Sequence, residues 1–268
     1  MEWTGSAIKS ISPQTCDEEF PRLIVHVETT QASVQDDQVL ERVHQALAER
    51  EVLPEVHLVD AGYTNAEGLV SSQQDYGITL LGPVAADPSW QAKAAEGFEK
   101  ASFLINWDQE TVICPAGKTN YSWLPNGDQS RGVIGGVRVQ FSAHDCTPCP
   151  VRAQCTRAKM APRELVVLPR DRYEALRAAK ERQNTATFRE EYAMRAGVES
   201  THAQALHRSG LRRTRYIGLA KTRLQHSFTA IALNMVRTVS WLTDTSLVEA
   251  PQPKTRLSPF AALEKVIA

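Results

Sequence analysis

The chain has 268 residues, of which 42% are hydrophobic and 23% are charged. This length and composition are sufficient for one large folded domain or two medium-sized ones. No apolar stretch reaches the roughly 18 residues of a membrane span, and the first residues lack the basic and apolar regions of a signal peptide. The sequence therefore argues against a membrane or secreted protein, and the expected location is the cytoplasm.

The formal net charge of -1 conceals two halves of opposite sign. Residues 1–150 hold 9 Lys and Arg against 21 Asp and Glu, a net charge of -12, whereas residues 151–240 hold 18 against 7, a net charge of +11. A local excess of this size can supply the phosphate contacts that dominate nucleic-acid affinity. A solvated helical surface rich in arginine is the simpler alternative at this point.

The first 83 residues alternate between patterns typical of strands and patterns typical of helices. Strands are expected over residues 22–30, 56–60 and 78–83, and helices over residues 39–47 and 67–76. Such alternation favours an α/β layer with parallel strands. Asp60 would then stand at the carboxyl end of a strand, where ligands bind in open α/β sheets.

The pattern changes after residue 83, because Gly, Pro, Asn and Asp become frequent and the expected strands are short. Long helical patterns return over residues 170–195 and 216–242, and a tail with three prolines follows from residue 243. We therefore predict an N-terminal core part, an inserted subdomain, a C-terminal helical part and a loosely ordered tail. Their ranges are residues 1–83, 84–162, 163–242 and 243–268.

Two carboxylates stand out as candidates for catalysis. Besides Asp60, Glu199 follows Tyr192 and Arg195 at spacings that place all three on one face of a helix. Mg²⁺ prefers carboxylate oxygens on rigid elements, and two-metal phosphoryl transfer needs several of them. Arg195 could contact a DNA phosphate. From these residues alone, a turn aspartate and an ordinary ion pair within a helix are the simpler alternatives.

The spacing Tyr-x2-Arg-x3-Glu, met by Tyr192, Arg195 and Glu199, resembles the signature of bacterial insertion-sequence DDE transposases, which have an RNase H-like core. Further stretches occur in the same order and look like the branch of that family whose core is interrupted by a Cys-rich insertion. These stretches are residues 24–30, 57–63, 114–117, 146–150 and 210–221.

The resemblance implies an α/β fold, namely an RNase H-like core with a small β-rich insertion and C-terminal helices. It also implies that Asp60 and Glu199 are the second and third catalytic carboxylates and bind Mg²⁺ in a two-metal site. Transposon-end DNA is the implied substrate, a second copy of the chain is a candidate partner, and no membrane is expected. The implied DNA-binding residues are Tyr192, Arg195, Arg208, Arg212, Arg213, Arg215, Lys221 and Arg223.

Two features depart from the family pattern. Leu206 stands where the signature usually carries a basic residue. The strand over residues 22–30 looks like the third of the core, so a second strand fits around residues 4–11 and the first, which bears the first Asp, has no room. The expectation is a transposase fragment without strand-transfer activity of its own. The alternatives are a non-catalytic DNA-binding remnant and an RNase H-like nuclease that uses Glu28 or Asp36.

Four of the five cysteines, Cys114, Cys146, Cys149 and Cys155, form a sequence cluster, whereas Cys16 stands apart. An odd number in this arrangement is a poor match to a secreted disulfide framework. Four thiolates would suffice for a tetrahedral structural zinc site, with His144 as an alternative ligand. Free thiols in a small β-rich insertion are equally consistent with the sequence, and neither interpretation makes the cluster catalytic.

Overall fold

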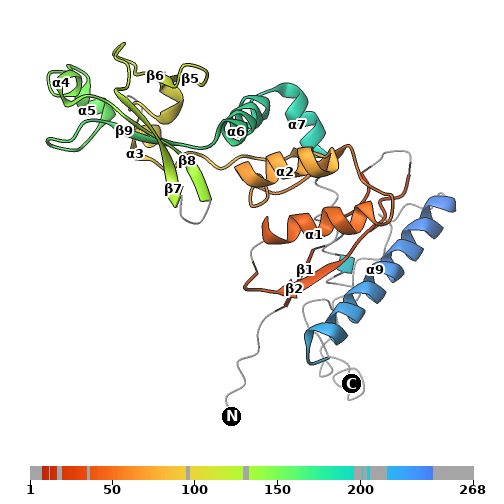
Figure 1. Ribbon diagram of the computed structural model, residues 1–268. Coiled ribbons are helices and arrows are strands. Elements are labelled where there is room, and N and C mark those ends of the chain that lie inside the picture. The colour runs from red at the N-terminus through yellow and green to blue at the C-terminus, as the bar shows by residue number, and fades with distance from the viewer. Residues whose placement is uncertain are drawn as a thin grey trace, which may run out of the picture. The chain divides into compact units, whose positions relative to one another are not determined.

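The computed structural model divides into two compact units. The first unit comprises Met1–Val34 with Ala196–Ala268, and the second comprises Gln35–Arg195. Figure 1 shows a mixed α/β chain with small sheets and helices. The four-part division expected from the sequence stays a prediction. The residues described are 8–11, 13–16, 20–34, 37–94, 97–128, 133–195, 201, 204–205 and 216–243.

The first unit contains a two-stranded antiparallel sheet. Strand β1 (Ile8–Ile11) pairs with β2 (Glu28–Gln31), as expected for a strand near residues 4–11. The strand predicted over residues 22–30 is wrong in extent, because only its last part is regular. Upstream of β2, Ile24 forms only an isolated antiparallel bridge with Gln14, and the Asn234 side chain accepts from the Ile24 N–H at 2.8 Å and donates to the Ile24 carbonyl at 2.9 Å. These backbone groups therefore bond a side chain rather than a strand partner.

Helix α9 (Leu219–Leu242) provides the other side of this unit's core. Ala230 and Leu233 on α9 pack with Ile24 and Ala205 in a small buried cluster. The apolar spacing of the sequence predicted this helix. Although α9 has 24 residues, no helix within the described ranges is long and apolar enough to cross a membrane.

The second unit begins with the expected alternation of helices and strands. Its elements are α1 (Asp37–Ala48), β3 (Val56–Leu58), α2 (Ala66–Tyr76) and β4 (Thr79–Leu81). Strands β3 and β4 pair in parallel, as predicted. Local signals fix α2 at both ends: the Asn65 side chain accepts from the Gly68 N–H, and Gly77 ends the helix with a left-handed φ of 70°.

Helix α6 (Arg170–Gln183) packs beside α2, as Figure 1 shows. The core between these elements and the parallel strands comprises Leu40, Val59, Leu69, Ile78, Leu80 and Ala179. The single helical region expected over residues 170–195 is two helices, because α7 (Ala186–Ala193) starts afresh after Asn184. Thr185 caps α7 by accepting from the Phe188 N–H, which favours a new helix start.

The Cys-rich part of the second unit is built on short elements, as predicted. Three of these elements form an antiparallel sheet in the order β7-β8-β9. Side chains of this sheet form a second core with Phe103, Val112 and Phe141. The chain continues to pair past residue 162, where β9 joins β8. The elements are α3 (Trp90–Lys93), the 3-10 helix η1 (Lys100–Ser102), β5 (Leu104–Asn106), β6 (Thr111–Ile113), β7 (Ser122–Asp128), β8 (Val133–Gln140), α4 (Ala143–Cys146), α5 (Arg152–Cys155) and β9 (Glu164–Val167).

Candidate functional site

Asp60 lies just beyond the carboxyl end of β3. The N–H of Val59 donates to the carbonyl of Leu81 at 2.9 Å, so pairing with the parallel neighbour continues to the residue before Asp60. The chain then turns, since the Tyr63 N–H donates to the Asp60 carbonyl at 3.0 Å. The carboxylate is 61% exposed. A rigid strand end thus presents an accessible carboxylate, as the sequence predicted.

Arg195 reaches this carboxylate from a distant part of the sequence. Its guanidinium nitrogen Nη2 lies 3.0 Å from Oδ2 of Asp60, and the arginine side chain is only 23% exposed. The two residues, singled out independently in the sequence, therefore meet within the second unit.

Tyr192 lies under the same arginine. The guanidinium carbon of Arg195 is 5.8 Å from the centre of the Tyr192 ring. That ring stacks at 5.4 Å on Phe188, which is buried. A cation over a tyrosine face gains electrostatic stabilisation. Tyr192 and Phe188 thereby support the arginine that faces Asp60.

The expectation of one helical face for Tyr192, Arg195 and Glu199 needs correction. Helix α7 ends at Ala193, and the Arg195 N–H donates to the Tyr192 carbonyl at 3.0 Å in a tighter turn. Arg195 thus follows the helix rather than lying on it. Glu199 is outside the described residues, as are Arg208, Arg212, Arg213 and Arg215.

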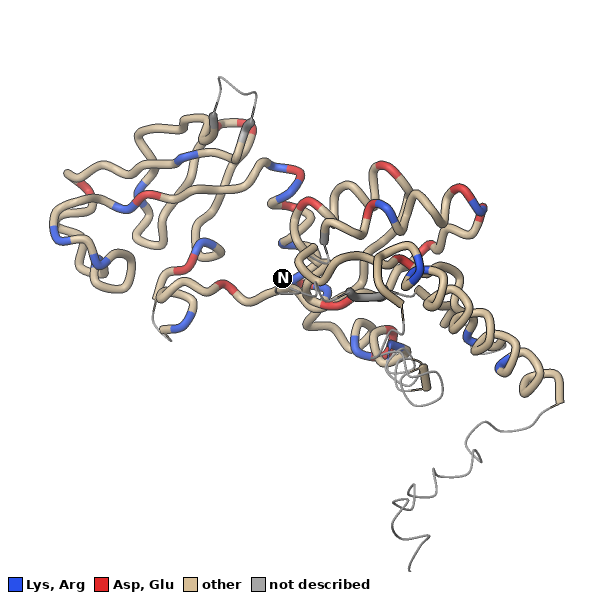
Figure 2. The backbone as a smooth tube through the Cα atoms, turned by 90° about the horizontal axis from the view of Figure 1, so that it is seen from below, with Lys and Arg blue, Asp and Glu red and all other residues tan. Residues whose placement is uncertain are grey.

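The remaining predicted DNA contacts, Lys221 and Arg223, are exposed in the first turn and a half of α9. Neither makes an ion pair within the described part of the chain. The cations of α6 differ, because Arg170, Arg172 and Arg177 each pair with a carboxylate. Figure 2 shows Lys and Arg on several elements, and those of α6 alternate with Asp and Glu whereas α9 has no acidic residue. Some of the cations of residues 151–240 are therefore already paired within the second unit.

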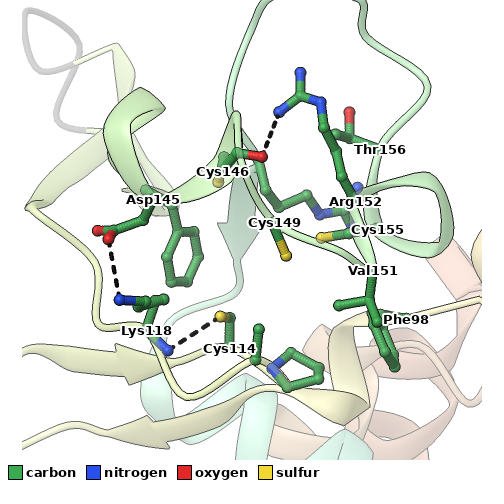
Figure 3. Close-up of a pocket in the computed structure, with 14 residues that line it drawn as sticks. Phe98, Cys114, Lys118, Asp145, Cys146, Cys149, Val151, Arg152, Cys155 and Thr156 are labelled. Atoms are coloured by element: carbon green, nitrogen blue, oxygen red, sulfur yellow. Dashed lines mark hydrogen bonds and ion pairs between the residues drawn. The ribbon is translucent and has the colours of Figure 1, made fainter.

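The four cluster cysteines, Cys114, Cys146, Cys149 and Cys155, line a single cavity of about 30 Å³, hereafter the cysteine cavity. Figure 3 shows their side chains around it. All four thiols are free and half-buried. Their sequence proximity is thus matched in space. His144, the alternative ligand, is exposed on α4 and does not line the cavity.

The groups that line the cavity act on the Cys155 thiol. Burial raises the pKa of the Cys155 thiol, Arg163 opposes this shift, and Cys146, Cys114 and Cys149 add to it. Within the described ranges, no three His, Cys, Asp or Glu side chains are already arranged as a metal ligand set. This holds for the surroundings of Asp60 and for the cysteine cavity.

Comparison with known proteins gives a match in one region. Residues 113–239 match the family model described as Transposase DDE domain. This match implies a role in DNA transposition and an RNase H-like fold for the DDE domain. No curated protein and no solved structure matches the chain significantly.

The matched DDE region includes the four cluster cysteines, Arg195 and Glu199, but it begins after Asp60. The match therefore agrees with the resemblance to DDE transposases for the C-terminal group of sequence motifs. DDE transposases generally use divalent metals and act on DNA, so both are implied for this region.

The sequence reading missed the positive residues around the cysteine cavity. Lys118, Arg152 and Arg163 all line it. A signal for Lys118 was available, because a Cys-Pro-Ala-Gly-Lys run predicts a tight turn that returns the lysine amide to the cysteine. No local pattern marked Arg163, which reaches the cavity only through the pairing of β8 with β9.

Proposed function

We propose that the chain has a role in DNA transposition through an RNase H-like DDE core, in which Asp60 and Glu199 bind Mg²⁺ as the second and third carboxylates, and that it performs no strand transfer by itself. Tyr192 and Arg195 would hold this site ready for DNA. The observation that carries the proposal is the 3.0 Å ion pair between Arg195 and Asp60. It joins the strand-end aspartate to the Tyr-x2-Arg part of the signature, and that signature lies within the region matched to the DDE domain.

The ion pair between Arg195 and Asp60 contributes little to stability, so Arg195 can change its partner. Asp60 is 61% exposed, and exposed ion pairs contribute only about 0–1 kcal/mol. A DNA phosphate can therefore replace the carboxylate as the partner of Arg195 at little cost. Arginine binds phosphate through two parallel N–H donors, so the same side chain fits both partners.

Release of Asp60 from Arg195 would leave its carboxylate available to a cation. Among the described residues Asp60 is the one member of the proposed ligand set, and Glu199 would be the second. Bound Mg²⁺ would supply charge neutralisation at the scissile phosphate. Asp60 itself contributes a carboxylate on a paired strand end, and Arg195 orients it until DNA arrives.

Metal binding can be tested without relying on turnover. Fe²⁺ bound in place of Mg²⁺ generates hydroxyl radicals, with ascorbate and peroxide, that cut a polypeptide near its metal ligands. We expect cuts near residues 60 and 199, suppressed by excess Mg²⁺. Asp60→Asn should lose them, whereas Asp75→Asn, which changes an exposed carboxylate at the end of α2, should keep them.

The same variants separate catalysis from simple DNA binding. If Asp60→Asn and Asp75→Asn give the same cutting pattern, Asp60 is not a metal ligand and the proposal fails. DNA binding that persists in that case, measured by gel shift, would favour the non-catalytic DNA-binding remnant. Metal-dependent DNA cleavage that is lost in Glu28→Gln as well as in Asp60→Asn would instead favour the rearranged nuclease.

A further inference from the structure

The cysteine cavity brings together side chains from separate short elements. Cys114 follows β6, Cys146 and Cys155 end the helices α4 and α5, and Cys149 lies in the turn between those helices. Phe98 and Phe141 contribute apolar walls. At about 30 Å³ the space is that of roughly one water molecule. A cavity of this size accommodates a single ion but no organic ligand.

A tight turn fixes the position of Cys114. The N–H of Gly117 donates to the Cys114 carbonyl at 2.8 Å, and Gly117 adopts a left-handed φ of 76°. This turn brings the Lys118 N–H to 3.3 Å from the Cys114 sulfur, the contact drawn as a dashed line in Figure 3. This contact holds the Cys114 side chain at the edge of the cavity.

Positive charge surrounds the thiols. Arg163 interacts electrostatically with Cys155, and Arg152 lines the cavity while donating to the Cys146 carbonyl at 3.1 Å. Lys118 lies at the rim, paired with Asp145 at 3.3 Å. Four thiolates around a divalent ion carry a net charge of about -2. The side chains of Arg152, Arg163 and Lys118, which line the cavity, would offset that negative charge.

The surrounding elements need a crosslink. Helices α4 and α5 have four residues each, and neither buries a residue of its own. Helices this short are unstable unless tertiary contacts hold them. Small segments with too little core are commonly held by disulfides or by metal. The described cysteines form no disulfide, so their thiols are available to bind a metal ion that would link these elements.

We propose that the cysteine cavity binds one structural Zn²⁺ ion through the thiolates of the four cluster cysteines. Thiolate ligands select zinc over hard cations such as Mg²⁺, and four protein ligands make a closed, non-catalytic site. The thiols are not yet arranged as a ligand set, so binding requires them to turn inward and to release their protons to solvent. This site is independent of the function proposed for Asp60.

The first test uses the unaltered 268-residue chain. Purified without chelator, it should contain about one zinc ion per chain by elemental analysis. After zinc removal under reducing conditions, added Co²⁺ should give the visible absorption of a tetrahedral thiolate complex. A chain that contains no zinc and also fails to give this Co²⁺ spectrum overturns the proposal.

Matched variants test which thiols are ligands. Loss of a group that only hydrogen-bonds to a metal ligand weakens metal binding by ~10-fold or more. Cys149→Ser removes a ligand itself, so it should weaken Co²⁺ binding by at least that factor. Cys16→Ser changes the cysteine outside the cluster and should leave Co²⁺ binding unchanged. Equal losses in both variants would contradict the assignment. If Cys149→Ser does not fold, the Co²⁺ spectrum of the unaltered chain still decides.

Two further readouts separate zinc from other states of the thiols. Mass spectrometry after alkylation should find five reduced cysteines, and a disulfide within the cluster would refute zinc ligation. Chelation should speed tryptic cleavage at Arg157 and Lys159, which are exposed just after α5. Cleavage rates that do not respond to chelation would show that the cavity holds no structural ion.

Discussion

Among single residues, Arg237 shows how burial changes the role of a charge. It is 7% exposed on α9, and its guanidinium donates to the carbonyl of Arg22 at 2.6 Å and to the hydroxyl of Thr201 at 2.5 Å. Weaker bonds reach the side chains of Gln14 and Gln204, both at 3.3 Å. Burial lowers the pKa of Arg237, and Arg22 lowers it further. This arginine therefore joins chain segments of the first unit rather than binding DNA.

Replacing Arg237 should destabilise the first unit. Arg237→Met keeps a flexible apolar stem but leaves buried acceptors without donors, so we expect a loss of about 2 kcal/mol or more in the free energy of unfolding. Urea titration followed by circular dichroism measures it, because α9 contributes a long helix to the signal. Arg223→Met, an exposed change on the same helix, should cost no more than ~0.5 kcal/mol. Similar costs for both would show that the Arg237 network contributes little.

Between elements, a histidine pair links α1 to β3. Nε2 of His44 lies 3.0 Å from Nδ1 of His57, and the His44 ring meets Tyr76 edge-on at 5.4 Å. Burial lowers the pKa of both histidines to about 4, and His44 also lowers that of His57 electrostatically. The pair is therefore neutral near pH 7, where one ring donates a hydrogen bond to the other.

This pair predicts that the second unit loses stability in mild acid. The folded pKa of about 4 is below the ordinary value of 6.5, so between these pH values the unfolded chain binds protons that the folded chain does not. Stability should be nearly constant well above pH 6.5 and fall by roughly 3 kcal/mol for each histidine that stays neutral in the folded chain on approaching pH 4. Urea midpoints measured across this range test the direction and the window.

Two sets of histidine variants test whether the His44–His57 pair causes the acid sensitivity. Replacing both buried histidines, as His44→Leu with His57→Val, should flatten the pH dependence even if absolute stability changes. His144→Gln removes an exposed histidine of the same unit and should leave the dependence intact. A slope that is unchanged in the double variant would assign the acid sensitivity to other groups.

For the whole molecule, the net charge of residues 151–240 overstates the surface available to DNA. Arg170, Arg172 and Arg195 pair with carboxylates that precede residue 151, and Arg237 is buried. Lys221 and Arg223 are exposed and make no ion pair within the described residues. Exposed cations without carboxylate partners are the better phosphate ligands, because binding DNA breaks no existing ion pair.

DNA affinity should therefore depend on Lys221 and Arg223 more than on Arg177. For duplex DNA, each phosphate contact adds about 0.9 to the slope of log affinity against log salt. Lys221→Gln with Arg223→Gln should lower that slope by up to about 1.8, whereas Arg177→Gln should leave it nearly unchanged. Gel shifts over a salt series measure these slopes. An equal effect of Arg177→Gln would argue for a diffuse basic surface instead.

The sequence by itself determined features that depend on local periodicity and chain stereochemistry. The alternation of strands and helices up to residue 83, the parallel β3 and β4, the helix end at Gly77 and the strand-end place of Asp60 all follow from such patterns. It also singled out Tyr192 and Arg195 by their spacing. It overestimated the strand before β2, where Ile24 forms only a single bridge with Gln14 and its N–H and carbonyl bond the side chain of Asn234.

Only the tertiary structure decided which distant residues meet. Arg195 contacts Asp60, the four cluster cysteines share one cavity, and Arg237 is buried while Lys221 remains exposed. Sequence spacing carries no information about these contacts, because they arise when the segments between them fold and close long loops. Local patterns set the elements, and packing between the elements determines whether a charge, a thiol or a carboxylate is available for chemistry.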